Sequence, residues 1–273
     1  MPEFKPFAGE HAIQAMGFVI ELAAPISSGV LVKLRTSLTE RWKKELPRRL
    51  DSHSITMSVG PDVTNAPPVM RPAGPFMLDR TLPNGQSEIA FRVAPEALGV
   101  NFTVYTRWKD IWSRARTFLQ SAAAELDKGP TVGAAVLTYV DRFVWDGDPS
   151  AASTEALLRP NSEFITPRVQ REPGQWHCYQ GFFEGENNPL PHQQLVNVNL
   201  DKKIEDNACV FEITTLHRSI VQAEKPALVN LLEPEESALD HLMSKMHERN
   251  KEILAAILSD EMCQRIALRE GRG

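Results

Sequence analysis

The spacing of hydrophobic residues changes several times along this chain, and each change marks a new structural element. From Trp108 to Leu126 apolar residues recur at helical spacing, until Gly129-Pro130 interrupts the pattern. From Thr131 to Trp145 both alternating sets of positions are largely apolar, which is typical of a central strand with both faces covered. This segment therefore predicts a core helix followed by a strand in the middle of a sheet.

The N-terminal part alternates between strand and helix patterns. The predicted elements are a strand at 11–22, a helix at 30–46, a short strand at 55–59, a proline-rich loop at 61–75, hairpin strands at 76–82 and 87–93, and a strand at 100–104. The hairpin strands flank Pro83-Asn84-Gly85, where Asn-Gly favours the two positive φ values of a type I′ turn.

The C-terminal part predicts a meander and a long closing helix. Its elements are a helical piece at 154–158, strands at 176–183, 194–200 and 208–214, and a helix at 234–268. The charged run from Asp201 to Asp206 is interpreted as the turn between the last two strands. Pro234 and the acidic residues Glu235 and Glu236 suit the first turn of the closing helix.

Because strands come in runs rather than alternating strictly with helices, the predicted class is α+β with a mainly antiparallel sheet. Two long packing helices and a long C-terminal helix complete it. We expect a single domain over residues 1–273. Two pseudo-duplicated halves, 1–105 and 106–273, are a further hypothesis, because each offers a long helix and a set of strands.

Composition favours an ordinary globular protein, with 42% hydrophobic and 24% charged residues. The net charge of −5, from 30 basic and 35 acidic residues, gives no global attraction to nucleic acid or to an anionic membrane. The chain shows neither an apolar run long enough to cross a bilayer nor a signal-peptide pattern. Three widely spaced cysteines indicate reduced thiols, so we expect a cytoplasmic protein.

Three segments carry a resemblance over nearly the whole chain. They are Phe7-Ala8-Gly9-Glu10-His11-Ala12-Ile13-Gln14 followed by Phe18, Leu137-Thr138-Tyr139-Val140-Asp141-Arg142-Phe143, and Met246-His247 with Leu254 and Ser259. They resemble a family of sporadically distributed, uncharacterised bacterial and archaeal proteins of about this length. In that family the central strand is usually of the type Tyr-Ile-Asn-Arg-Ile, and an aromatic residue usually stands where this chain has Leu254. The resemblance implies no known activity. Such patchily distributed families often accompany mobile elements, defence loci or toxin-antitoxin loci, which favours partner binding and a prokaryotic origin.

Signatures of catalysis, metal binding or cofactor binding are absent from the sequence. Adjacent residues of a strand point to opposite faces, so His177 cannot activate Cys178. His241 and His247 lie on different sides of one helix and cannot share a metal. The glycines form no phosphate-binding fingerprint. We therefore predict no catalytic residues, no metal and no cofactor.

A metal-dependent hydrolase or nuclease with an unrecognised carboxylate site is the alternative function. Pro61-Asp62 and Asp201-Lys202-Lys203 could supply a nuclease metal site, although a charged turn is the favoured interpretation of the second. Convergence in one pocket of three or more carboxylates would favour this alternative. The candidates are Asp141, Glu184, Asp201, Glu205 and Glu212.

Two groups of basic residues are candidate binding sites. Arg142, His217 and Arg218, together with Arg107, could form an anion site, although pairing of Arg142 with Asp141 or Glu212 is the favoured interpretation. The second group gathers around the end of the first helix and could dock an acidic partner or a phosphate backbone: Arg41, Lys43, Lys44, Arg48 and Arg49. Cations near a helix C-terminus also occur for dipole reasons alone.

The leading functional hypothesis is a non-enzymatic protein that binds another macromolecule. It would act as the regulatory or neutralising member of a prokaryotic defence or toxin-antitoxin pair. A protein partner is favoured over nucleic acid because of the net charge, no membrane is expected, and a homo-oligomer is left open. A third hypothesis, a small ligand beside Trp108 and Trp112, requires an enclosed cavity at those indoles.

Overall fold

A computed structural model describes residues 2–52, 54–55, 70–71, 74–126, 129–186, 191–222, 225–232 and 237–268. Ten strands form one antiparallel sheet: β1 (Phe4–Pro6), β2 (Ile13–Leu22), β3 (Arg48–Asp51), β6 (Phe76–Thr81), β7 (Ser87–Ala94), β8 (Ala97–Phe102), β9 (Val132–Trp145), β10 (Trp176–Glu186), β11 (His192–Glu205) and β12 (Ala208–Val221). Strands β4 (Ser54–Ile55) and β5 (Met70–Arg71) pair separately. The helices are α1 (Ser28–Trp42), α2 (Trp108–Ala123), α3 (Pro167–Gln170), α4 (Leu228–Leu232), α5 (Ala238–Ile257) and α6 (Asp260–Arg265), with a 3₁₀ turn η1 (Pro149–Ala151).

The large sheet runs in the order β10-β11-β12-β9-β2-β8-β7-β6-β3, and β1 adds to the end of β9. Apart from β3, which extends one edge by a fourth strand, this order is symmetrical about the central pair β2–β9. On one side three consecutive strands, β8, β7 and β6, continue the sheet, and on the other side β12, β11 and β10 do so. The prediction of an α+β fold with a mainly antiparallel sheet is therefore confirmed.

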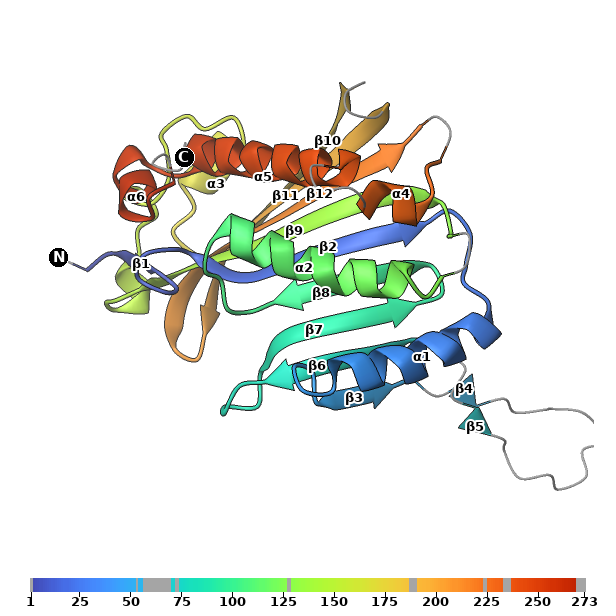
Figure 1. The fold of residues 1–273 in the computed structure, drawn as a ribbon. Helices are drawn as coiled ribbons and strands as arrows, with labels where there is room; N and C mark the ends of the chain where they lie inside the picture. The colour runs from blue at the N-terminus through green and yellow to red at the C-terminus, as the bar shows by residue number, and fades with distance from the viewer. Residues whose placement is uncertain are drawn as a thin grey trace, which may run out of the picture.

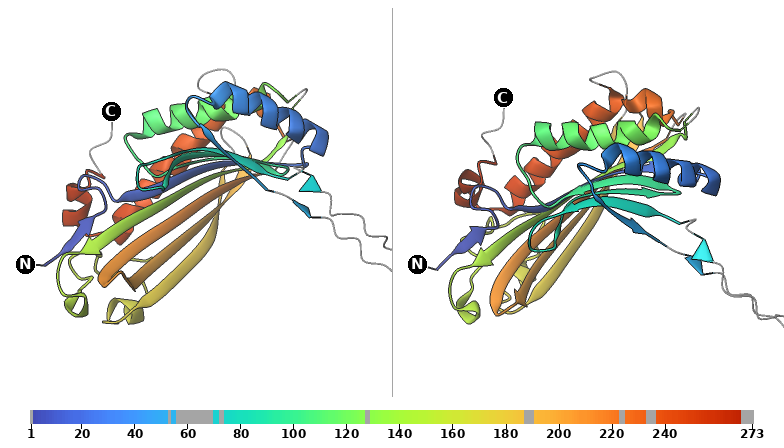
Figure 2. Two further views of the ribbon diagram at one scale, coloured as in Figure 1. Left: turned by 90° about the horizontal axis from the view of Figure 1, so that it is seen from below. Right: turned by 60° about the horizontal axis from the view of Figure 1, so that its bottom comes forward.

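Helices α1, α2 and α5 lie on the same face of this sheet (Figures 1 and 2). Ser27 caps α1 by accepting a hydrogen bond from the backbone of Val30, and Ser237 caps α5 in a reciprocal pair with Asp240. Phe18 of β2 packs against both Trp108 and Trp112 of α2, with the ring of Trp112 at 5.2 Å. The apolar stripe predicted for this helix thus seals the first half of the sheet.

Strand β9 lies between β12 and β2, as predicted for a central strand. The expectation that both of its faces are covered was wrong. Tyr139, Asp141 and Phe143 are buried beneath the helices. None of the three long helices packs over the opposite face (Figure 2), where Ala134 and Val136 are buried while Thr138 and Val140 are half-buried. Neighbouring side chains of an antiparallel sheet shield these positions without a second layer.

The turn between β6 and β7 differs from the type I′ prediction. Of its residues only Gly85 has a positive φ, of 84°. The turn forms one residue earlier, with Pro83 and Asn84 at its two central positions, because the φ near −65° that the proline ring fixes suits the first central position of a type I turn. The amide of Gly85 donates a hydrogen bond to Leu82 O, and the amide of Leu82 donates one to Gln86 O, which closes the hairpin. The loop is therefore a tight turn followed by one left-handed glycine.

The predicted helix at 234–268 is interrupted in the structure. Helix α5 ends at Ile257, Leu258 is extended with φ −84° and ψ 150°, and it forms a β-bridge with Leu158. Ser259 then caps α6 by accepting from the backbone of Met262. A good N-cap residue inside the apolar pattern starts a second helix, which periodicity alone does not reveal.

The charged run at 201–206 is mostly strand rather than turn. Strand β11 continues to Glu205, and the turn consists of Asp206 and Asn207, whose φ values are 48° and 62°. Residues 154–158 form a single turn instead of a helix. The strand predicted at 55–59 beyond its first residue, most of the loop at 61–75, and Pro234 to Glu236 lie outside the described residues.

None of the helices in the described ranges is long and apolar enough to cross a membrane. Cys178, Cys209 and Cys263 are buried and form no disulfide within the described residues, so their thiols pack as small core residues.

Candidate functional site

No long helix of the described residues covers the face of the sheet opposite α1, α2 and α5 (Figure 2). Alternation along β12 sends Ile213, Thr215 and His217 under α5, while Glu212, Leu216 and Arg218 point to the uncovered face. The same alternation applies to β11. We call this surface the open face.

A row of mainly apolar residues crosses five strands of the open face. Register places Phe183 of β10 beside Leu195 of β11, Leu195 beside Arg218 of β12, Arg218 beside Val136 of β9, and Val136 beside Val19 of β2. Phe183 is 60% exposed at the end of this row. The row offers a partner an apolar band that ends at the outer strand.

Strand β10 forms one edge of the sheet and pairs only with β11. In the described part of the chain its backbone forms no further backbone hydrogen bond, so one side of an 11-residue strand keeps free donors and acceptors. Tyr179, which is 56% exposed, and Phe183 stand on its open face, separated by Gly181. A long free edge with exposed aromatic rings is a template for pairing with another strand.

The loop before β10 packs on the other side of this strand. Cys178 Sγ lies 3.8 Å from Phe164 O, and the rings of Phe164 and Phe182 are 6.2 Å apart. Gln180 Nε2 donates to Glu163 O at 3.3 Å. These contacts hold the helix-side face of β10 and leave Tyr179 and Phe183, on its other face, exposed to solvent.

The candidate anion site of Arg142, His217 and Arg218 is not assembled as one group. Arg142 pairs with Glu205 at 2.7 Å and lies 3.9 Å from Glu212, the cross-strand partner favoured by the sequence. Arg218 binds both carboxylate oxygens of Glu21, with contacts of 2.6 to 3.1 Å. His217 points to the helix side of β12, away from both arginines.

Most of the basic cluster around the end of α1 is engaged by neighbours. Lys43 pairs with Glu40, and Arg49 pairs with Asp51 at 3.0 Å. Arg48 forms a two-bond contact with the buried Asp79. Arg41 lies over the ring of Trp42 at 5.7 Å, and Lys44 is exposed. Partial neutralisation weakens the case for a phosphate-binding patch. Arg107 is exposed at the N-cap of α2.

The five candidate carboxylates do not converge in one pocket. Asp141 and Glu184 face the helix side, where Glu184 pairs with Arg249 at 2.6 Å. Asp201, Glu205 and Glu212 share the open face. Each has a basic partner: Asp201 lies 2.7 Å from His177 Nδ1, and the two glutamates pair with Lys203 at 2.8 and 3.2 Å. The described residues contain no group of three or more His, Cys, Asp or Glu able to hold a metal. Pro61 and Asp62 lie outside the described residues.

A layer of buried polar groups separates two apolar clusters beneath α5. One cluster contains Met246, and the other contains Ile253. Between them Asn250 Oδ1 accepts from Thr215 at 2.5 Å and from His217 Nε2 at 3.4 Å. Burial lowers the pKa of His217 to about 4, so the ring stays neutral and serves as a hydrogen-bonding core residue.

The three segments that carry the family resemblance meet at one end of this layer. Ile13 pairs with Asp141 across β2 and β9, and Tyr139 OH lies 2.7 Å from His247 Nδ1. His11 packs against Tyr105 with ring centroids 5.3 Å apart. We call these residues the Asp141 cluster: His11, Tyr105, Tyr139, Asp141 and His247.

Burial dominates the electrostatics of the Asp141 cluster. It raises the pKa of Asp141 to about 7 and lowers the pKa of His247 to about 4. Burial, followed by the charge of Asp141, raises the pKa of Tyr105 to about 12. Asp141 Oδ2 and His11 Nδ1 are buried without a hydrogen-bond partner among the described residues. Because Asp141 is only 1% exposed, it cannot touch a solute, and its charge acts on stability.

The indoles of α2 contact protein groups closely. Trp108 stacks on His247 at 4.2 Å, and Trp112 Nε1 donates to Asp240 at 2.7 Å. These contacts leave the hypothesis of a ligand beside the two indoles without support.

Comparison with known proteins adds no relative: no family profile matches the chain, and no curated protein is significantly similar to it. The sequence singled out charged residues, whereas the open face is marked by the exposed aromatic residues of β10. Its signal in the sequence is the alternation of Tyr179, Gly181, Phe183 and Gly185.

Proposed function

We propose that this protein is a non-enzymatic binding protein that takes up a strand of another protein along the free edge of β10. The added strand pairs with the backbone of β10 and lays apolar side chains against Tyr179 and Phe183. The partner segment is therefore extended and carries apolar residues at alternating positions.

The free edge of β10, next to two exposed aromatic rings, is the observation that carries this proposal. Natural sheets usually protect long edges with charges, prolines or bulges. The open-face positions of β10 hold His177, two glycines and two aromatic residues, with no proline among them. Its pairing with β11 continues without a bulge from Trp176 to Glu186. An edge of this kind favours a strand as its occupant.

Charge supports a protein partner over nucleic acid. The cations of the open face are largely neutralised, since Arg142, Lys203 and Arg218 all pair with glutamates. A phosphate backbone needs several free cations in a row. Among the described residues no group of three or more His, Cys, Asp or Glu could hold a metal, so the alternative, a metal-dependent hydrolase or nuclease, has no supporting geometry there.

The finer parts of the functional hypothesis remain part of this proposal. A regulatory or neutralising role in a prokaryotic defence or toxin-antitoxin pair rests on the family resemblance, and a cytoplasmic setting rests on the three free thiols. The strand order supports the proposal of two pseudo-duplicated halves, 1–105 and 106–273. Helix α2 packs on β2 and β8 of the first half, so a boundary after α2 suits the strand order better than one at 105.

We expect Phe183→Asp to reduce recovery of the partner at least about tenfold, because truncation of a central aromatic anchor typically costs that much binding. The protein is purified by affinity from its native host, and co-purifying proteins are quantified by mass spectrometry. Since Phe183 is 60% exposed, the variant should fold normally.

Val32→Asp is the matched control, because Val32 is 48% exposed on α1, on the opposite face of the sheet. It should retain the partner at the wild-type level. A partner that is retained equally by both variants, or lost equally from both, would show that β10 is not the binding site.

A further inference from the structure

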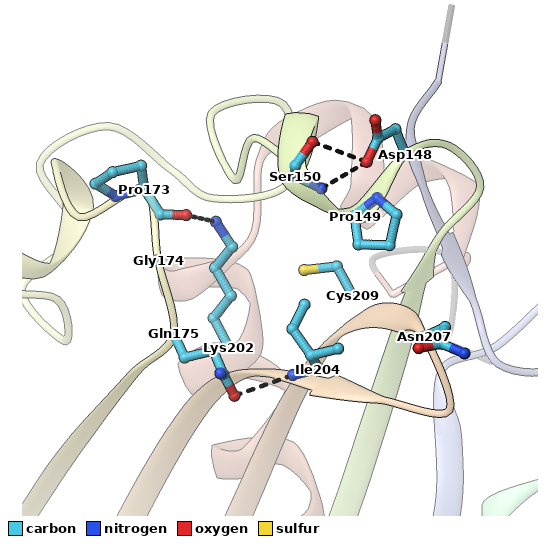
Figure 3. Close-up of a pocket in the computed structure, with 10 residues that line it drawn as sticks. All are labelled: Asp148, Pro149, Ser150, Pro173, Gly174, Gln175, Lys202, Ile204, Asn207 and Cys209. Atoms are coloured by element: carbon cyan, nitrogen blue, oxygen red, sulfur yellow. Dashed lines mark hydrogen bonds between the residues drawn. The ribbon is translucent and has the colours of Figure 1, made fainter.

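A pocket of about 710 Å³ lies at the end of the β11–β12 hairpin (Figure 3). None of the residues that line it belongs to β10. Its walls are the loop at 148–150, the loop at 173–175, and Lys202, Ile204, Asn207 and Cys209 of the hairpin. Lys202 lies on the helix side of β11, opposite to Asp201 and Lys203.

Lys202 is a buried cation without a carboxylate partner. Its side chain is 5% exposed, and Nζ donates to Pro173 O at 2.7 Å and to Ala152 O at 2.9 Å. An ammonium group has three donors, so the two carbonyls leave one unused. Within the described part of the chain it forms no ion pair.

Two other buried charged residues have partners of opposite charge. Arg35 lies 3.1 Å from Asp51, and the buried Asp79 is held by Arg48. A buried charge is costly unless an opposite charge compensates it. Two carbonyl dipoles orient the Lys202 ammonium group but supply no opposite charge. An anion bound in the pocket would form the ion pair that Lys202 lacks.

The pocket walls define which anion fits. Pro149, Pro173 and Ile204 contribute apolar surface, and burial raises the pKa of the Cys209 thiol, which therefore stays uncharged. Asp148 stands at the rim, where hydrogen bonds from Ser150 lower its pKa and keep it ionised. One ammonium donor and a negative rim suit a single negative charge and disfavour phosphates, which need several donors.

We propose that this pocket binds an organic monocarboxylate, whose carboxylate accepts the third hydrogen bond of Lys202 and whose apolar part lies against Pro149, Pro173 and Ile204. The carboxylate can belong to a free small molecule or to the C-terminus of a peptide. This proposal is independent of the strand-addition function at β10.

Ligand-observed NMR titration of the full chain tests the proposal. The free-molecule probes are hexanoate and benzoate, with hexanamide as the neutral counterpart of hexanoate. The peptide probe is an acetylated tripeptide of three leucines with a free C-terminal carboxylate, and its amidated form is the counterpart. We expect at least one carboxylate to bind and its neutral counterpart to bind at least about tenfold more weakly, since a charged hydrogen bond is lost. The probe that binds identifies the source.

Three variants locate the site. Lys202→Met should weaken binding about tenfold or more, but it also removes the bonds to Ala152 and Pro173. Ile204 is 45% exposed, so Ile204→Glu should fold, and its added negative charge should weaken carboxylate binding about tenfold, whereas Ile204→Gln should change it less than about threefold. Failure of every carboxylate to bind, equal binding of the neutral counterparts, or binding unchanged by Ile204→Glu would overturn the proposal.

Discussion

Asp141→Asn should stabilise the protein at pH 8 by about 2 to 4 kcal/mol. Asp141 is buried, and its pKa is raised from 3.8 to about 7 because burial disfavours the ionised carboxylate. A shift of one pKa unit corresponds to about 1.4 kcal/mol, which sets the upper end of this range. The amide of asparagine has nearly the same shape and never ionises. Chemical denaturation at several pH values measures the effect.

The gain should depend on pH in a defined direction. Between pH 3.8 and 7 the folded carboxyl keeps a proton that the unfolded chain has lost, so the stability contributed by this group falls as pH rises through that interval. The advantage of Asp141→Asn should therefore be about 2 to 3 kcal/mol larger at pH 8 than at pH 5. His217 and His247, with pKa values lowered to about 4, act in the opposite sense and destabilise the fold below about pH 6.5 in both proteins.

Asp201→Asn is the control, because Asp201 lies half-buried on the open face and bonds His177. It should give no advantage that grows with pH. If Asp141→Asn behaved in the same way, burial would not disfavour the ionised form of Asp141 in the folded protein.

Phe118→Ala should destabilise the fold by about 3 to 5 kcal/mol, the usual loss for a large aromatic residue in a core. Phe118 is fully buried on α2 and connects two elements: its ring lies 4.6 Å from Trp42 of α1 and 5.6 Å from Phe91 of β7. Its truncation leaves a cavity where helix and sheet meet. Urea denaturation with the wild type in parallel gives the difference.

Thr117→Ala on the exposed side of the same helix controls for helix propensity and should change stability by less than about 0.5 kcal/mol. A loss below about 1 kcal/mol for Phe118→Ala would mean that α2 does not pack on the sheet through this residue.

Hydrophobic spacing predicted the elements that bury a regular stripe. The helix at 108–126 and the strand at 131–145 correspond closely to α2 and β9, and the three C-terminal strands form the expected meander. In these segments local pattern and final packing agree. Spacing could not show that β9 is covered on one face only, because a central strand is apolar on both sides whether or not a second layer is present.

Boundaries set by single residues were harder to predict. Pro83 overrides the preference of Asn-Gly for a type I′ turn, and Ser259 starts a new helix within a continuous apolar pattern. In both cases one backbone preference decides the local structure.

The Asp141 cluster and the Lys202 pocket depend on contacts that no local pattern contains. Tyr139 and His247 are 108 residues apart, and Lys202 reaches Ala152 and Pro173 in two different loops. The sequence interpretation placed Lys202 in a charged turn, whereas strand alternation turns it inward, away from Asp201. The resemblance did mark three segments of the Asp141 cluster, but only the fold brings them together.

Photo-crosslinking from β10 tests the binding function most directly. A benzoylphenylalanine replaces Phe183 in one protein and Val32 in another, and both are irradiated in the native host. The strand-addition account predicts that the probe at position 183 forms adducts with one extended, alternately apolar segment of a single partner protein, and that the probe at position 32 does not. Adducts that are the same from both positions, or that join two copies of this chain, would contradict it.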